Sequence, residues 1–265
     1  MICLLLYLQM DVKSLQGEDI QKEEHQNEES QKLQKLQKLQ KYQESQKTPK
    51  ISKFLEYAEA YKQRPLNIVI AGIIGVGKTE LTKQFATITG WYAVHEPVKN
   101  NPVLEAFYSD MKANSFLLQA FFLNERYELH QRMIWADKPS VQDRCVWEDP
   151  IFALMLFKAG LMSKVEFNVY QKMFANMTRG LARPHLIIYL DVTPQVALDR
   201  IALRGRECEK SITLEYLTSL RAGYEDWLDD MKQYIPILRI DWSEFQTVDS
   251  IMDQIPSTLK KSIMC

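Results

Sequence analysis

Short apolar stretches alternate along the chain with longer segments whose apolar residues recur at helical spacing, beginning near Leu66. This alternation is typical of an α/β fold, in which helices flank a parallel sheet. The first stretch is rich in β-branched residues, as strands buried on both faces are. Five stretches are predicted to form the strands of the sheet: residues 66–71, 91–95, 140–142, 185–190 and 235–240.

The longest predicted helix runs from about Ser115 to Ala136. Its first half is apolar on almost every side, which indicates burial against more than one neighbour. Gln119 is therefore expected inside the fold, and Arg126, about two helical turns later, returns to the same face. Buried polar side chains need partners, and a nucleobase would supply them. The alternative is an arginine that reaches solvent beside a glutamine bonded to the backbone.

The N-terminal part of the chain has a different composition. Residues 21–47 are mainly Gln, Lys and Glu, and their leucines at every third position do not build the fixed seam of a coiled coil. We predict a low-complexity, disordered tail over residues 1–50 and a catalytic domain over residues 51–265, with a partner-binding helix as the alternative for the tail. Residues 1–10 are apolar but too short to span a bilayer, and Met10 is a second candidate start.

Charge and cysteine content exclude several classes of protein. The net charge of −1 argues against a nucleic-acid-binding surface. The four cysteines have no C-x-x-C spacing, which argues against a disulfide framework or a zinc site. We therefore expect a cytoplasmic protein in a reducing compartment, with small-molecule partners and without nucleic-acid or membrane partners.

A glycine-rich segment connects the first predicted strand to the next helix. From Gly72 to Thr79 it reads Gly-Ile-Ile-Gly-Val-Gly-Lys-Thr and fits the phosphate-loop pattern G-x-x-x-x-G-K-[ST]. Glycines allow backbone N–H groups to approach phosphates that side chains would block. Lys78 would contact the β- and γ-phosphates of a bound nucleotide, and the Thr79 hydroxyl is an oxygen ligand suited to Mg²⁺. The predicted phosphate-binding residues are Gly72, Gly75, Gly77, Lys78 and Thr79.

Charged residues follow two further predicted strands. Glu96 comes after the second strand, and Asp143 and Arg144 end the third. The carboxyl ends of parallel strands share one edge of a sheet, and ligands bind in the crevice outside that edge. Each residue alone is compatible with a solvated loop charge, but their common position predicts a site.

Three arginines lie close together after the fourth strand, at Arg200, Arg204 and Arg206. Their like charges repel one another unless anions lie among them. Because the fork of an arginine matches phosphate oxygens, a lid over transferring phosphates explains the cluster. The alternative is a surface basic patch paired with Glu207 and Glu209.

Taken together, these residues resemble the deoxynucleoside kinase family, over the chain from about Leu66 to the C-terminal helix. The Glu-Pro-Val that follows the second strand in the family is present as Glu96-Pro97-Val98. Its Asp/Glu-Arg-Ser motif is present as Asp143-Arg144-Cys145, with cysteine in place of serine. A second departure is Cys208, which interrupts the acidic stretch of the lid.

The resemblance implies a P-loop kinase fold and ATP-dependent phosphorylation of the 5′-hydroxyl of a deoxynucleoside. Glu96 would be the general base, Arg144 would orient Glu96 and the reacting oxygen, and Lys78 would act with the lid arginines on the phosphates. Thr79 and Asp143 would hold Mg²⁺ directly or through water. Substrate would be held by Tyr108 and Glu209 at the sugar 3′-hydroxyl and by Gln119, Arg126 and Asp149 at the base.

Two segments, residues 96–102 and 148–152, resemble the bacterial deoxyadenosine/deoxyguanosine kinase branch more than the animal deoxycytidine enzymes. The resemblance therefore implies purine deoxynucleosides as substrates, deoxyadenosine first, in nucleotide salvage, and a homodimer. A deoxycytidine-preferring or broad-specificity kinase is the alternative. Two others are a thymidylate-type monophosphate kinase, whose glycine-rich continuation after Glu-Pro is absent here, and a non-catalytic nucleotide-binding switch.

Overall fold

The computed structural model of the protein describes residue 37 and residues 48–60, 65–95, 101–206 and 209–263. The fold presented below is that of the unit from Thr48 to Cys265. Several predicted features lie outside the described residues, namely the low-complexity tail up to residue 47, Met10, Glu96 with residues 97–100, Glu207 and Cys208. The predictions made for them, and the predicted domain boundary at residue 50, stay predictions.

The centre of the fold is a parallel sheet of five strands in the order β2-β3-β1-β4-β5. The strands are β1 (Asn67–Ala71), β2 (Tyr92–Val94), β3 (Ser140–Asp143), β4 (Leu186–Asp191) and β5 (Ile237–Asp241). All five predicted strands are confirmed, with ends that move by no more than two residues. Because β1 pairs with β3 on one side and β4 on the other, the glycine-rich segment leaves the sheet at the middle of its edge.

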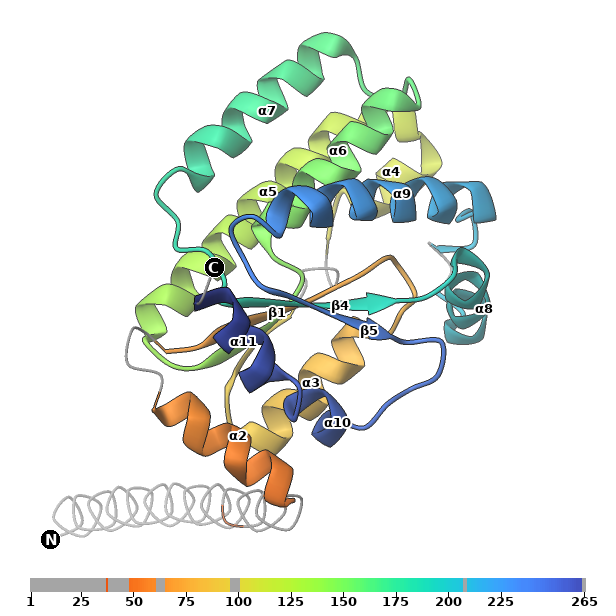
Figure 1. Ribbon diagram of the computed structural model, residues 1–265. Coiled ribbons are helices and arrows are strands. Elements are labelled where there is room, and N and C mark those ends of the chain that lie inside the picture. Colours follow the sequence, from red (N-terminus) through yellow and green to blue (C-terminus); the bar gives the residue numbers. More distant parts are fainter. Residues whose placement is uncertain (1–36, 38–47, 61–64, 96–100, 207–208, 264–265) are drawn as a thin grey trace, which may run out of the picture. The chain divides into compact units, whose positions relative to one another are not determined.

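Helices cover both faces of the sheet (Figure 1). One face carries α2 (Pro49–Glu59), α3 (Lys78–Thr89), α10 (Val248–Met252) and α11 (Ile255–Ile263). The other carries α5 (Met111–Ala136), α6 (Asp149–Lys158) and α9 (Leu214–Met231), with α7 (Lys164–Thr178) packed outside them on α5 and α6. The remaining helices are α4 (Leu104–Ser109), the short 3₁₀ helix η1 (Val146–Glu148) and α8 (Pro194–Arg204). Among the helices described, none is long and apolar enough to cross a membrane.

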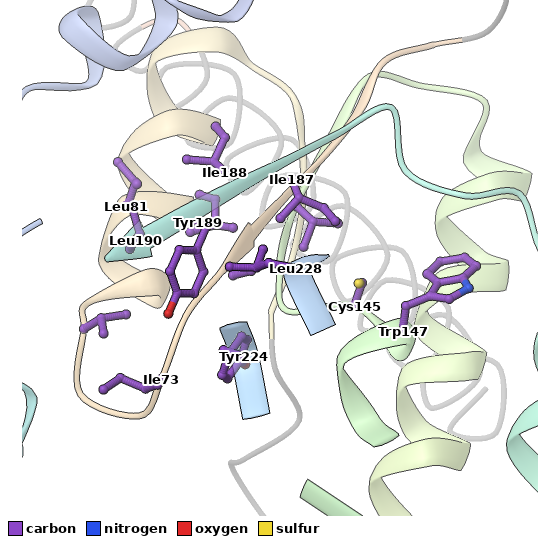
Figure 2. Close-up of a cluster of buried hydrophobic side chains, with 14 of the residues drawn as sticks. Ile73, Leu81, Cys145, Trp147, Ile187, Ile188, Tyr189, Leu190, Tyr224 and Leu228 are labelled. Atoms are coloured by element: carbon purple, nitrogen blue, oxygen red, sulfur yellow. The ribbon is translucent and has the colours of Figure 1, made fainter. Parts of the chain in front are cut away.

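The core lies on both sides of β1 and β4, whose residues are almost all buried. On one side, Phe85 of α3, Phe54 of α2 and Trp91 form a cluster in which each ring contacts the other two, with centroid distances of 5.4 to 5.9 Å. On the other side, the ring centroids of Tyr224 in α9 and Tyr189 in β4 lie 5.8 Å apart (Figure 2). Burying a large apolar side chain contributes roughly 1.5–3 kcal/mol, so these clusters fix the helices that carry the site.

The long helix α5 begins at Met111, four residues before the predicted start at Ser115. The cause is Asp110, whose side chain accepts a hydrogen bond from Ala113 N at 3.0 Å and caps the helix. The prediction for the face of this helix is confirmed, because Gln119 and Arg126 are only 4% and 6% exposed.

Candidate active site

The glycine-rich segment forms a tight loop between β1 and α3. Gly72, Gly75 and Gly77 have φ values of 146°, 88° and 101°, a region that side chains disfavour. A Cβ atom at Gly75 would lie 2.5 Å from the Ala197 carbonyl oxygen and 2.7 Å from Ile201 Cγ1. Only glycine therefore allows this loop to pack against α8, and the loop leads directly into the N-terminus of α3.

Lys78 and Thr79 occupy the first turn of α3. The buried Lys78 ammonium donates a hydrogen bond to the Ile73 carbonyl oxygen at 2.9 Å, so the side chain folds back over the loop. The Thr79 hydroxyl donates to the Asp143 carboxylate at the end of β3. A hydroxyl next to one carboxylate provides hard oxygen ligands, and this pair fits Mg²⁺, which also takes oxygens from substrate phosphates and water. Within the described ranges, no group of three His, Cys, Asp or Glu residues has the arrangement of a metal site.

A cavity of about 780 Å³ opens beside the loop. Among the predicted site residues, those that line it are Gly75, Gly77, Lys78, Thr79, Tyr108, Gln119, Arg126, Arg144, Arg200, Arg204, Arg206 and Glu209. Three others lie behind this lining: Gly72 at the base of the loop, Asp143 behind Thr79, and Asp149 behind Arg126. The structure thus brings the residues predicted from separate motifs to one cavity.

The wall formed by α5 contains an ion pair between Arg126 and Asp149. The two side chains are 6% and 0% exposed, so the pair is almost completely desolvated. The Arg126 guanidinium also lies over the ring of Phe122, 4.7 Å from its centroid. Gln119 lines the cavity from the same helix. This wall offers donors from arginine and glutamine, with a carboxylate directly behind them.

The opposite wall contains the arginines at the end of α8. Arg204 Nε lies 3.0 Å from Glu209 Oε2, and Arg206 Nη1 lies 3.2 Å from Glu209 Oε1. Glu209 is largely buried, and all three side chains line the cavity. The ion pairs with Glu209 that the surface-patch alternative predicted are therefore present. They lie at the cavity, however, and not on a separate surface.

Arg200 makes different contacts from the other two arginines. Its guanidinium donates to the carbonyl oxygens of Val76, Trp242 and Ser243 at 3.3, 2.9 and 3.0 Å. It also lies over the Phe245 ring at 4.3 Å, and burial lowers its pKa. Arg200 therefore connects the phosphate loop to the segment that follows β5.

Arg144 follows β3 with a φ of 66°, which is unusual for a residue with a side chain. Its backbone N–H donates to the Ile70 carbonyl oxygen at 3.1 Å, at the end of the neighbouring strand β1. Its guanidinium lies 4.8 Å from the centroid of the Phe152 ring. Backbone and side chain are thus held in one orientation at the cavity.

Sequence reasoning did not identify all of the lining residues. The additional ones with aromatic or imidazole side chains are His95, Phe107, Phe122, Phe152, Tyr216 and Phe245. Aromatic residues at helical spacing are equally compatible with the hydrophobic core. The sequence therefore gives no signal that distinguishes cavity-lining aromatic residues from core residues. His95 had a usable signal, since it follows the second strand directly.

The phosphate loop, the oxygen pair behind it and the arginines opposite surround one cavity, and this is the arrangement with which P-loop kinases position and stabilise a transferring phosphoryl group. A family profile described as "Deoxynucleoside kinase" matches residues 68–264. The chain belongs to the deoxynucleoside kinase family, and it is accordingly a phosphotransferase with an alcohol group as acceptor.

Individual relatives agree with this assignment. A deoxyadenosine kinase from Dictyostelium discoideum is 42% identical over 189 residues, which cover 71% of this chain and 77% of the relative. A deoxyadenosine/deoxycytidine kinase from Bacillus subtilis (strain 168) is 36% identical over 201 residues, covering 72% and 92%. A solved structure of deoxyadenosine kinase from M. mycoides with bound dATP is 27% identical, with a TM-score of 0.65, and covers 74% of this chain and 99% of that one. The predicted fold and enzyme class are confirmed.

Proposed function

We propose that this protein uses ATP to phosphorylate the 5′-hydroxyl of purine deoxynucleosides, with deoxyadenosine as the preferred acceptor. The buried pair of Arg126 and Asp149 carries the proposal, because a base that reaches Arg126 meets guanidinium donors with an acceptor carboxylate directly behind them. The names of the relatives from Dictyostelium discoideum and M. mycoides support a deoxyadenosine acceptor. The cavity volume of about 780 Å³ is typical of small-molecule sites, which span about 300–1,000 Å³.

Deoxycytidine is the second candidate acceptor. Like adenine, cytosine has an exocyclic amino group that can donate to a carboxylate, whereas thymine has a carbonyl oxygen at the position of the cytosine amino group and a methyl group beside it. The relative from Bacillus subtilis is named for both deoxyadenosine and deoxycytidine, which favours this second candidate over thymidine. A site that leaves a buried polar group unpaired can reject an analogue by as much as about 10⁴–10⁵-fold.

In the proposed reaction, the acceptor 5′-oxygen attacks the γ-phosphorus of ATP. The new oxygen–phosphorus bond forms as the bond to the β–γ bridging oxygen breaks, ADP leaves, and the 5′-hydroxyl proton passes to Glu96. Lys78, Arg204 and Arg206 would stabilise the negative charge on the phosphates, and Arg144 would orient the reacting oxygen. Thr79 and Asp143 would hold Mg²⁺, which neutralises phosphate charge when bound. Positioning and charge stabilisation supply most of the catalysis in this scheme.

The sugar would be held near the arginine wall. We assign the 3′-hydroxyl to Tyr108 and Glu209, which both line the cavity. Since Glu209 also contacts Arg204 and Arg206, one carboxylate would connect the sugar to the residues that contact the phosphates. An acceptor that carries a 3′-hydroxyl would thus favour the arginine positions needed for transfer.

We further propose a cytoplasmic homodimer. Exposed apolar side chains on α5 and α7 support the dimer: Leu117, Val165 and Val169 are 53%, 73% and 44% exposed. A second copy that covers these helices would bury them. The cytoplasmic assignment depends on the cysteine pattern, which suits a reducing compartment.

The test is kcat/KM for the four natural deoxynucleosides, with thymidine monophosphate as a fifth acceptor and ATP as donor. We expect deoxyadenosine to be the best substrate, thymidine to be at least about 10³-fold poorer, and Arg126→Met to reduce this selectivity. The matched control is Arg183→Met, which removes a guanidinium that also lies over an aromatic ring, that of the exposed Tyr234. This control should leave selectivity unchanged. Thymidine as the best wild-type substrate would refute the acceptor assignment. Turnover of the monophosphate alone, or ATP binding without turnover, would favour a monophosphate kinase or a nucleotide-binding switch.

A further inference from the structure

Glu148, at the end of η1, is a completely buried carboxylate close to Arg144. The Tyr224 hydroxyl lies between the two residues. It accepts a hydrogen bond from Arg144 Nη1 and donates one to Glu148 Oε2 at 2.7 Å. Arg144 Nη1 and Glu148 Oε2 are themselves 4.0 Å apart. Three buried polar groups, from the residue after β3, from η1 and from α9, therefore form one connected chain.

Glu148 and Tyr224 are each fixed by further contacts. The other oxygen of Glu148 accepts a hydrogen bond from Cys145 N at 2.8 Å, which holds the carboxylate against the turn that follows Arg144. Tyr224 is held by aromatic neighbours: its ring centroid lies 5.8 Å from that of Tyr189 (Figure 2). The ring of Trp227 lies 5.9 Å away. Because an arginine only donates, the hydroxyl accepts from Arg144 and gives its own proton to Glu148.

A buried carboxylate at this position is expensive for the fold. Burial raises the pKa of Glu148, while the charge of Arg144 and the hydrogen bond from Tyr224 act in the opposite direction. Apolar residues of similar volume often pack as well as or better than a buried ion pair, so packing alone does not require this arrangement. What it provides is a defined direction for the Arg144 guanidinium, which lines the cavity.

We propose that Glu148 and Tyr224 are positioning residues that hold the Arg144 guanidinium in the orientation needed for phosphoryl transfer. The inference rests on the proposed function, in which Arg144 orients the reacting oxygen. Arginine has many rotamers, and a guanidinium fixed before the reaction loses no freedom in the transition state. Neither residue needs to touch the substrate for this effect.

The first test is Tyr224→Phe, which removes only the hydroxyl and keeps the ring in the core. We expect kcat to fall by about 10- to 100-fold, the size of a lost hydrogen bond to a charged group, with KM for ATP within about twofold of wild type. Tyr189→Phe is the matched control, because it removes a hydroxyl from the same aromatic cluster, and the charged groups that act on that hydroxyl do not include Arg144. Glu148→Gln, which keeps the shape of the side chain, should lower kcat in the same way. It serves as the test variant if Tyr224→Phe does not fold.

The second test separates positioning from general stability by a double-mutant cycle with Arg144→Lys. A lysine cannot use the Tyr224 hydroxyl in the same geometry, so Tyr224→Phe should lower kcat by less than about twofold in the Arg144→Lys background. Equal effects in both backgrounds would overturn the inference, as would a Tyr224→Phe enzyme no slower than Tyr189→Phe. A wild-type protein that phosphorylates no deoxynucleoside would instead refute the proposed function.

Discussion

The Thr79 hydroxyl donates a hydrogen bond to the Asp143 carboxylate, although the two residues are 64 positions apart in the sequence. The contact exists because β1 and β3 are neighbours in the sheet, with Ile70 paired to Asp143. The first residues of α3 and the end of β3 therefore meet at the same edge. Sequence spacing alone places each residue after a strand, and the strand order brings them together.

This pair predicts the magnesium dependence of the enzyme. Asp143→Asn keeps the shape of the side chain and removes its charge, so we expect half-maximal activity to require about 10- to 100-fold more Mg²⁺. The measurement is initial rate against Mg²⁺ concentration at saturating ATP and deoxyadenosine. Thr89→Ala, at the other end of α3, is the control and should leave the curve unchanged. An unchanged curve for Asp143→Asn would remove Asp143 from the metal site.

Glu96 is predicted to be the general base from its position after the second strand and from the family motif. General-base catalysis contributes typically 10²–10⁴-fold, so Glu96→Gln should lower kcat by about that factor. ATP binding, followed by equilibrium titration, should survive, since the phosphate loop is untouched. Near-wild-type kcat at saturating substrate would contradict the assignment.

Gly75 is predicted to tolerate no side chain. In Gly75→Ala the new methyl group would meet the Ala197 carbonyl oxygen at 2.5 Å while φ stays at 88°. We expect a loss of about 1–3 kcal/mol in the free energy of unfolding, together with weaker ATP binding because the loop must move. Thermal melting with and without ATP measures both effects. Gly180→Ala, where no atom lies within 4 Å of the added Cβ, should melt like wild type, and equal melting of the two variants would contradict the prediction.

His130 predicts that stability falls in mild acid. Burial lowers the pKa of this histidine below its usual value of 6.5, while the backbone carbonyl of Ala182, 2.8 Å from Nε2, acts in the opposite direction. As pH falls below about 6.5, the unfolded chain binds a proton that the folded protein resists, so unfolding becomes easier. His130→Gln should therefore lose less in melting temperature between about pH 7 and pH 5 than wild type does. An exposed position, His95→Gln, serves as control, and equal pH slopes for wild type and His130→Gln would exclude the effect.

The polar N-terminal tail is predicted to be dispensable for catalysis. The structure suggests a deletion that ends at residue 47, because Thr48 caps α2 through Ile51 N and Lys50 forms an ion pair with Asp253. Removal of residues 1–47 should leave kcat and melting temperature nearly unchanged. Removal of residues 1–50 also deletes the cap, which costs about 1 kcal/mol. Loss of activity or of the native assembly in the shorter deletion would show that the tail contributes to the folded enzyme.

The sequence predicted those parts of the fold that depend on local chemistry. The strands follow from runs of apolar residues, and the phosphate loop between β1 and α3 follows from its pattern of glycines. The start of α5 was missed because Asp110 follows a segment that is itself helical, so the cap lies between two helices.

Contacts between distant segments could not be predicted in the same way. Tyr224 and Glu148 are 76 positions apart, and nothing near either residue indicates the other. Their contact depends on how α9 packs over the sheet. The order of the strands in the sheet could not be predicted either, because five similar apolar stretches can pair in many arrangements. Site residues in motifs were therefore accessible to sequence reasoning, and the residues that hold them were not.

The central position of β1 divides the candidate site into two halves, to which the proposed reaction gives different tasks. On the side of β2 and β3, helices α4 and α5 present Tyr108, Gln119 and Arg126 to the cavity. On the side of β4 and β5, α8 presents its arginines. In the proposed reaction the phosphoryl group passes from the side of α8 to the side of α4 and α5, beyond the carboxyl end of β1. Acceptor choice can then be redesigned by substitutions on α4 and α5 while donor use, which depends on the phosphate loop and α8, is inherited unchanged.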